Sequence, residues 1–133
     1  MSTRSATGDC VKVIAVVRPL IARELALGSS EALVIAEDSV ATKSGHQFTY
    51  DGVSRGSEDE LAVTYDVHVK EIVGGVLQGY NGSVMAYGQT GSGKTHTMGM
   101  GGDNAGAGMA RRVFDTIFAS IADCEVMTTV KVC

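Results

Sequence analysis

Residues 88–95 read Gly-Gln-Thr-Gly-Ser-Gly-Lys-Thr, and this stretch constrains the fold of the chain more than any other. It satisfies every fixed position of the pattern G-x-x-x-x-G-K-[ST], which marks a phosphate-binding loop. Residues 83–87, Ser-Val-Met-Ala-Tyr, precede the loop and are predicted to form a short buried strand. The residues that follow Lys94 suit the first turn of a helix. This order of strand, glycine-rich loop and helix predicts an α/β fold.

Each residue type in the loop has a separate role in phosphate binding. Gly88, Gly91 and Gly93 allow a tight turn in which successive N–H groups point toward phosphate oxygens. The ammonium of Lys94 can reach the β and γ phosphates, and the hydroxyl of Thr95 can bind Mg²⁺. A glycine-rich turn that matches the pattern by chance would not need the strand before it or the helix after it. The loop therefore predicts a site for a nucleoside triphosphate.

Composition excludes several other classes of function. The chain has 133 residues, which suits about one domain, and its net charge of -4 without a basic run argues against a nucleic-acid-binding face. No apolar run is long enough to span a bilayer, and residues 1–9 lack the apolar region of a signal peptide. We therefore expect no membrane partner and a cytoplasmic location.

The cysteines and histidines do not form a metal-binding pattern. Cys10, Cys124 and Cys133 are odd in number and far apart, so we interpret them as reduced thiols. His46 and His68 are also isolated in sequence and are interpreted as solvated or buried side chains. His96 differs because it lies beside the phosphate loop, which makes it a candidate for ligand contact.

The N-terminal half of the chain reads as short strands. Residues 1–9 are predicted to be a disordered leader, and residues 11–17 a buried strand that ends at Arg18-Pro19. Residues 20–28 suit a connector or a single helical turn closed by Gly28. Three β-prone pieces predict a small antiparallel meander, and they cover residues 33–36, 39–43 and 47–50. Residues 51–56 are predicted to be a loop.

The C-terminal half reads mainly as helices. Residues 61–77 fit both strand alternation and helical spacing, but their length and a capping box at Ser57 and Glu60 favour a helix that ends near Gly79. The apolar positions of residues 109–122 step by four and predict an amphipathic helix. Residues 99–108 are rich in glycine and are expected to be flexible, and residues 125–133 start a new strand.

The residues around the phosphate loop carry more information than the loop itself. Residues 79–83 and 86–99 closely resemble the nucleotide-loop signature of the kinesin motor domain. Phosphate binding does not require Gln89-Thr90 or Thr97-Met98-Gly99, so these residues make the resemblance specific. It implies a P-loop NTPase-type three-layer fold with a mainly parallel central sheet, incomplete here, plus the small meander. It also implies binding of ATP and Mg²⁺, and ATP hydrolysis coupled to movement along microtubules of the cytoskeleton.

The resemblance covers almost the whole chain and departs from the family pattern at two places. Residues 18–24 look most like the kinesin-4, or chromokinesin, group, while the first Arg of the Arg-x-Arg-Pro segment is Val16 and the Pro of Gly-Ile-Ile-Pro-Arg is Arg111. Loss of the first Arg implies an altered affinity for the base. The resemblance assigns nucleotide contacts to Arg18, Pro19, Gly88, Gln89, Thr90, Gly91, Ser92, Gly93, Lys94, Thr95 and His96. The resemblance also implies catalytic roles for Lys94 and Thr95, with Thr95 as the Mg²⁺ ligand.

Two motifs of the family do not occur in the sequence. These are the Asn-x-x-Ser-Ser-Arg-Ser-His and Asp-Leu-Ala-Gly switches, which in the family follow this segment together with most of the microtubule-facing surface. We therefore expect residues 10–133 to be the N-terminal part of a motor domain, with very slow hydrolysis and unpaired sheet edges. The sequence contains no heptad repeat, so it does not indicate an oligomeric state.

Two other functions remain open from the sequence. A soluble P-loop kinase or GTPase would share the loop, although it would not be expected to share the flanking residues. A truncated product without motor activity would contain the loop and lack the switches.

Overall fold

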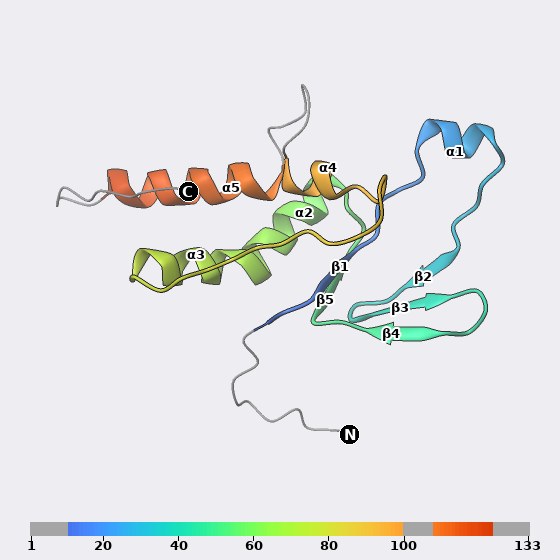
Figure 1. Ribbon diagram of the computed structural model, residues 1–133, viewed down its shortest axis with the longest axis horizontal. Coiled ribbons are helices and arrows are strands. Elements are labelled where there is room, and N and C mark those ends of the chain that lie inside the picture. The colour runs from blue at the N-terminus through green and yellow to red at the C-terminus, as the bar shows by residue number, and fades with distance from the viewer. Residues whose placement is uncertain (1–10, 100–107, 124–133) are drawn as a thin grey trace, which may run out of the picture. The chain divides into compact units, whose positions relative to one another are not determined.

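The computed structural model describes residues 11–99 and 108–123 of the chain (Figure 1). These residues form two compact units, divided between Arg55 and Gly56. The first unit holds all the strands of the described residues and one short helix, and the second holds the remaining helices and the glycine-rich loop.

The first unit contains a parallel pair of strands, β1 (Ile14–Val16) and β5 (Gly52–Ser54). The ladder continues beyond the strands, because the N–H of Val17 donates to the carbonyl of Ser54 at 2.7 Å. At the other end, the N–H of Asp51 donates to the carbonyl of Val13 at 3.0 Å. The carboxylate of Asp51 in turn accepts from the N–H of Val13 at 2.8 Å. A side chain thus extends the pairing by one residue.

Two predictions for this region were wrong. The first strand is shorter than residues 11–17 and only half-buried, because β5 offers three residues on one side and no described strand lies on the other. Residues 52–54, predicted to lie in a loop, form β5. Only Val53 among them has a strong strand preference, so the strand exists through its pairing with residues far away in the sequence.

The predicted antiparallel meander is confirmed. It consists of β2 (Leu33–Ile35), β3 (Ser39–Thr42) and β4 (Gln47–Thr49), with β3 in the middle. Val40 on β3 is buried, whereas β4 is exposed throughout. The helical turn predicted within residues 20–28 is also confirmed as α1 (Ala22–Ala26), which is followed by Gly28 at a φ of 74°.

The second unit is built on a helix that runs from residue 58 to residue 77. It comprises α2 (Glu58–Thr64), one π-helical turn η1 (Tyr65–Val69) and α3 (Lys70–Leu77). The hydroxyl of Ser57 caps it by accepting from the N–H of Glu60 at 3.4 Å. The prediction of a capped helix in this stretch is therefore confirmed.

The π-helical turn was not predicted, and it has a packing role. The buried side chains of this helix are mainly Leu61, Tyr65, Val69 and Val73, each four residues after the last. A step of four overshoots the α-helical turn of 3.6 residues, so such a stripe would wind around a regular helix. The wider turn at residues 65–69 takes up the overshoot and keeps the four side chains on one face.

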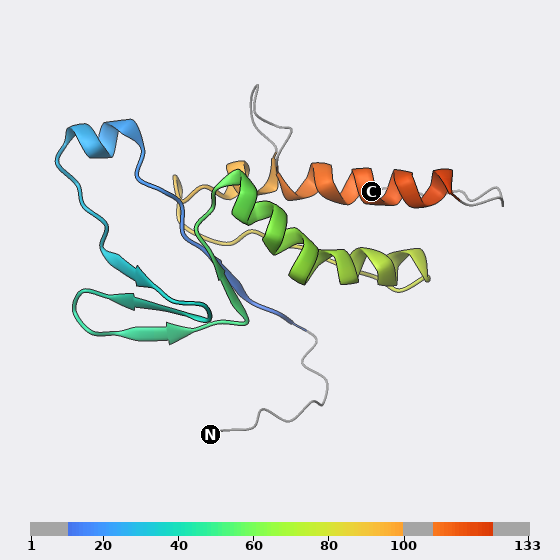
Figure 2. The same cartoon turned by 180° about the vertical axis from the view of Figure 1, so that it is seen from behind.

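That face packs against α5 (Met109–Ala122), which agrees with the helix predicted from the sequence. Figures 1 and 2 show α5 lying alongside α3 and the turn that precedes it. Met109 and Ile117 are the buried side chains of α5, and the hydroxyl of Thr116 is hydrogen-bonded to that of Tyr65.

The strand predicted before the phosphate loop is absent. Residues 83–87 have no regular secondary structure, and Met85 and Tyr87 are 89% and 102% exposed. The physical reason is that a central strand owes its burial and ladder bonds to neighbouring strands, and none of the described strands pairs with this segment. Just before it, Gly82 passes so close to α3 that a Cβ there would lie 2.6 Å from Cγ2 of Ile72.

Several predictions lie outside the described residues. They concern the disordered leader, the glycine-rich stretch at residues 100–107, the last strand and all three cysteines. Within residues 11–99 and 108–123, no helix is long and apolar enough to cross a membrane. The same residues contain no cluster of His, Cys, Asp and Glu able to hold a metal ion.

Candidate nucleotide-binding site

The phosphate loop has the backbone that its glycines predict. Gly91 and Gly93 adopt φ values of 80° and 100°, in the left-handed region that favours glycine. The turn is closed by a bond from the N–H of Ser92 to the carbonyl of Gln89 at 3.2 Å. At Gly88 the constraint is steric, because a Cβ there would lie 2.6 Å from the hydroxyl oxygen of Ser92. The loop therefore depends on glycine for two different reasons.

Lys94 bends back over the start of the loop. Its ammonium donates to the carbonyls of Gly88 and Gln89, both at 2.8 Å, and the residue is half-buried. Two carbonyl dipoles thus fix a positive charge at the mouth of the loop. The carbonyls belong to residues of the motif itself, so the sequence pattern and the position of the charge are directly linked.

The helix α4 (Lys94–Met98) begins at this lysine, with Gly93 as its N-cap. The first N–H groups of a helix have no acceptor within the helix, and they point toward its N-terminal end. The N–H of Thr97 is the first to be paired inside this turn, with the carbonyl of Gly93 at 2.9 Å. The N-terminal end of α4 therefore faces the loop with backbone donors and a lysine charge, which suits an anion.

A hollow of about 350 Å³ opens beside the loop. It is lined by Thr90, Gly91, Gly93, Lys94, Thr95 and His96. All six are residues that the sequence assigned to nucleotide contact. The structure thus brings together the C-terminal part of the predicted site, with the side chains of Thr95 and His96 exposed to an incoming ligand.

The residues present suit Mg²⁺ as well as phosphate. Thr95 supplies a hydroxyl oxygen, a hard donor of the kind that Mg²⁺ accepts, and its residue is exposed at the hollow. Mg²⁺ is usually bound through one or two protein oxygens plus phosphate oxygens, so a single hydroxyl here is compatible with it.

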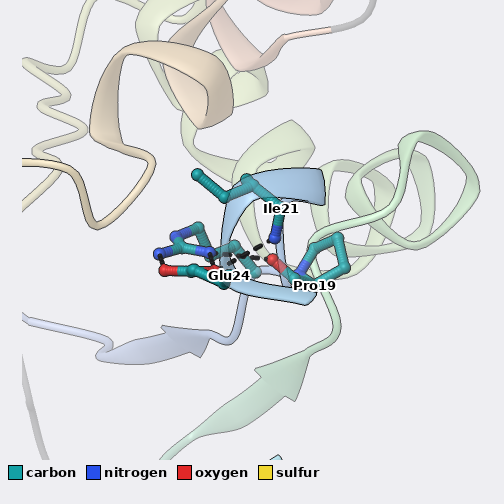
Figure 3. Close-up of polar contacts among 4 residues, drawn as sticks. Pro19, Ile21 and Glu24 are labelled. Carbon is teal, nitrogen blue, oxygen red and sulfur yellow. Dashed lines mark hydrogen bonds and ion pairs between the residues drawn. The ribbon is translucent and has the colours of Figure 1, made fainter. Parts of the chain in front are cut away.

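The other predicted contacts, Arg18 and Pro19, belong to the first unit. The guanidinium of Arg18 donates to both carboxylate oxygens of Glu24 on α1, at 2.8 and 2.6 Å, and to the carbonyl of Pro19 at 2.9 Å (Figure 3). The carboxylate of Glu24 also accepts from the N–H of Ile21 at 3.0 Å. These hydrogen bonds link the segment that follows β1 to α1.

Sequence reasoning missed Glu24. Two hydrogen bonds lower the pKa of its carboxyl from 4.5 to about 2. The bond to the Arg18 guanidinium has the larger effect, and the bond to the N–H of Ile21 the smaller. The same pair raises the pKa of Arg18. The available signal was its position, three residues after the N-cap Ile21, where a glutamate can reach back to the backbone of the cap.

A second hollow, of about 210 Å³, lies between the π-helical turn and α5. It is lined by Tyr65, Asp66, Arg112, Asp115 and Thr116. Its acids have cationic partners, since Asp66 pairs with Lys70 at 3.3 Å and Asp115 with Arg111 at 2.9 Å. It has no glycine-rich turn, and we assign the phosphate site to the first hollow.

Comparisons with known proteins show the family of the chain. The family model described as the kinesin motor domain matches residues 9–133. The chain is 40% identical over 116 residues to the Kinesin-like protein KIN-4A of Arabidopsis thaliana, and 40% identical over 114 residues to KIN-4C of Oryza sativa subsp. japonica. These alignments cover 85% and 83% of the chain. Both relatives accord with the kinesin-4 resemblance of residues 18–24.

The similarity extends to other kinesins and to a solved structure. The kinesin heavy chain of Drosophila melanogaster is 38% identical over 122 residues, which is 89% of this chain. The solved structure of a fast kinesin superposes with a TM-score of 0.72 at 33% identity and covers 86% of this chain.

The chain spans 34% of that solved chain and about a tenth of the curated relatives, 11% for KIN-4A and 9% for KIN-4C. The match confirms the predicted kinesin motor fold of the P-loop NTPase type in part, as a parallel strand pair, a small antiparallel sheet and helices. It also favours membership of the kinesin family over a soluble P-loop kinase or GTPase. The chain belongs to the kinesin family, and it corresponds to part of the kinesin motor domain.

Proposed function

We propose that this chain binds ATP with Mg²⁺ through residues 88–96, as the phosphate-binding part of a kinesin motor. The observation that carries the proposal is the position of the Lys94 ammonium, held at 2.8 Å from the carbonyls of Gly88 and Gln89 at the mouth of the loop. A fixed positive charge beside the first backbone N–H groups of a helix is a site for a polyphosphate.

Each residue has a separate task in this proposal. The backbone N–H groups of residues 93–95 bind phosphate oxygens, and Lys94 neutralises charge on the β and γ phosphates. The exposed hydroxyl of Thr95 would hold Mg²⁺, which would supply charge neutralisation for the phosphates. Gly88 leaves room for the side chain of Ser92, because a Cβ at residue 88 would lie 2.6 Å from the Ser92 hydroxyl oxygen.

The base side of the site is proposed from the family pattern. Arg18 and Pro19 match the Arg-Pro of the Arg-x-Arg-Pro segment, and His96 adjoins the loop. Val16 stands where the family pattern has its first Arg. We propose that these residues contact the nucleoside with one cationic contact fewer than the family pattern provides.

The motor function is proposed for the same family reason. We propose ATP hydrolysis coupled to movement along microtubules, and hence a cytoskeletal location, for the kinesin motor that this sequence represents. The solved structure of the fast kinesin, to which this chain is similar, concerns an ATPase that interacts with microtubules. The groups that act on the γ-phosphate in the family belong to switch motifs that do not occur in these 133 residues. Phosphate binding is therefore the part of the cycle assigned to this chain.

The test is a titration of the chain with MgATP by isothermal calorimetry. Lys94→Ala removes the charge at the loop, and we expect the affinity to fall by about tenfold or more, because charge-assisted bonds to phosphate are among the strongest in proteins. Lys70→Ala is the matched control, since Lys70 is an exposed lysine of the same unit, paired with Asp66 on the helix surface. Equal affinity of the Lys94→Ala variant and the unmodified chain would remove the site assignment.

A further inference from the structure

Gly108 lies directly against the C-terminal end of α4. A Cβ on this glycine would lie 2.7 Å from the carbonyl carbon of Met98 and would overlap the backbone nitrogen and Cα of Gly99. All of these atoms belong to the backbone, so no side chain could turn aside to make room. Gly108 is buried, although residues 100–107 separate it from Gly99 in the sequence. The contact therefore requires glycine at residue 108.

Each of the two glycines caps a helix at this contact. Gly99 ends α4 with a φ of 76°, and its N–H donates to the carbonyls of Thr95 and His96 at 3.0 and 3.1 Å. Gly108 is the N-cap of α5, and its carbonyl accepts from the N–H of Arg112 at 3.3 Å. The contact thus joins the last turn of α4 to the first turn of α5, and two opposite views show α4 at the start of α5 (Figures 1 and 2).

The two helices differ in how well they are anchored. The longer helix, α5, has 14 residues, packs against α3 and buries Met109 and Ile117. The shorter helix, α4, has five residues and buries none of them. An isolated helix shorter than about 12 residues is marginal in water, so α4 depends on the contacts at its ends for its position. One end carries the phosphate loop, and the other meets Gly108.

We propose that Gly108 is a positioning residue for the phosphate site, because it allows α4 to rest on α5. This inference rests on the proposed function, in which residues 88–96 bind the triphosphate. Gly108 does not line the hollow beside the loop and acts through α4, whose first residue is Lys94. A helix of five residues is only about 7.5 Å long, so a displacement at Gly99 reaches Lys94 and its bonds to the loop carbonyls.

The experiment replaces Gly108 by alanine in the full chain and measures binding by isothermal calorimetry. Of the two ligands, MgATP carries a base, whereas magnesium tripolyphosphate carries the phosphates alone. We expect Gly108→Ala to weaken both ligands by the same factor, about tenfold, because α4 must move away from α5 to admit the added methyl group. Gly74→Ala is the matched control and should bind both ligands normally, since a Cβ at this helical glycine of the same unit would meet nothing within 4 Å.

Amide hydrogen exchange separates positioning of α4 from a general loss of stability. The N–H groups of Thr97 and Gly99 are bonded to carbonyls of residues 93, 95 and 96, so their exchange reports on the opening of α4. The amide of Ile117, in the middle of α5, reports on the rest of the unit. In Gly108→Ala, exchange at Thr97 and Gly99 should accelerate by a larger factor than exchange at Ile117.

The unmodified chain allows a second measurement that needs no variant. Coupling between two sites is reciprocal, so a ligand on the loop should strengthen the contact that holds α4. The amide of Arg112 is bonded to the carbonyl of Gly108 and reports on the start of α5. Addition of magnesium tripolyphosphate should slow exchange at Arg112 by a larger factor than at Ile117.

Each other outcome contradicts the inference in a recognisable way. Normal binding by Gly108→Ala would show that the contact does not position the loop, and a loss confined to MgATP would show an effect on the nucleoside. Equal acceleration of exchange in α4 and at Ile117 would mean that Gly108 acts through stability alone. If Gly108→Ala does not fold, the unmodified chain decides, and equal slowing at Arg112 and Ile117, or none, overturns the proposal. If the unmodified chain binds neither ligand, the proposed function itself fails, and this inference fails with it.

Discussion

The ammonium nitrogen of Lys94 lies 2.8 Å from the carbonyl oxygen of Gly88, so the last part of the phosphate loop is tied to its first residue. The bond closes the loop around its own glycines and fixes the charge that a triphosphate needs. A loop arranged in this way before a ligand arrives loses little conformational entropy on binding. We therefore expect few substitutions in the phosphate loop to leave ligand binding unchanged.

Gly88→Ala should weaken MgATP binding by about tenfold, because a Cβ at residue 88 would lie 2.6 Å from the hydroxyl oxygen of Ser92 and overpacking typically costs about 1–3 kcal/mol. Calorimetry with MgATP measures the effect. Ser92→Ala in the same chain should restore part of the affinity by removing that oxygen. Gly74→Ala, a helical glycine with open space around it, is the control and should bind normally. Normal binding by Gly88→Ala would show that the loop is not constrained there.

Gly82→Ala should destabilise the chain, because a Cβ at residue 82 would lie 2.6 Å from Cγ2 of Ile72 and 3.0 Å from Cγ2 of Val76 on α3. We expect a loss of about 1–3 kcal/mol in the free energy of unfolding, measured by urea titration. Gly74→Ala should instead gain up to about 1 kcal/mol, because alanine is the better helix former. The packing of residue 82 on α3 would be contradicted by a variant as stable as the unmodified chain.

Tyr65→Phe tests the contact between the π-helical turn and α5. Its hydroxyl is bonded to that of Thr116, and Tyr65 is buried. Removing the hydroxyl should cost about 1 kcal/mol of unfolding free energy, measured by urea titration. Thr116→Val should lose a similar amount, and the double variant less than the sum, because each single change removes the same bond. Strict additivity would mean that the two hydroxyls act independently.

Acid should weaken the contribution of Glu24 to stability. The bonds to Arg18 and Ile21 lower the pKa of its carboxyl from 4.5 to about 2, so folding favours the charged form. The stabilisation is complete above about pH 4.5 and is lost as the pH falls through the pKa of the folded chain, near 2. The difference in thermal midpoint between the unmodified chain and Glu24→Gln should therefore shrink from pH 5 toward pH 2. A difference that stays constant over this range would contradict the lowered pKa.

Features with a local cause could be predicted from the sequence. The cap at Ser57, the helix from Met109 to Ala122 and the turn closed by Gly28 each depend on residues within a few positions of one another. The glycines of the phosphate loop belong to the same class, since their backbone angles follow from the motif. Spacing along the chain was sufficient for all of these.

Features that depend on distant partners could not be predicted. The strand β5 exists because residues 52–54 pair with β1, and residues 83–87 lack a strand because no described neighbour pairs with them. The π-helical turn follows from the need to keep a four-residue stripe on one face against α5. In each case the deciding contact is tertiary.

The most direct test of the central claim is a ³¹P NMR titration of MgATP with the full chain. If residues 88–95 bind the triphosphate, the β and γ resonances should shift or broaden on addition of the chain and should recover with Lys94→Ala, while Lys70→Ala behaves as the unmodified chain. Resonances that respond equally to the unmodified chain and to Lys94→Ala would contradict the claim that this loop binds ATP.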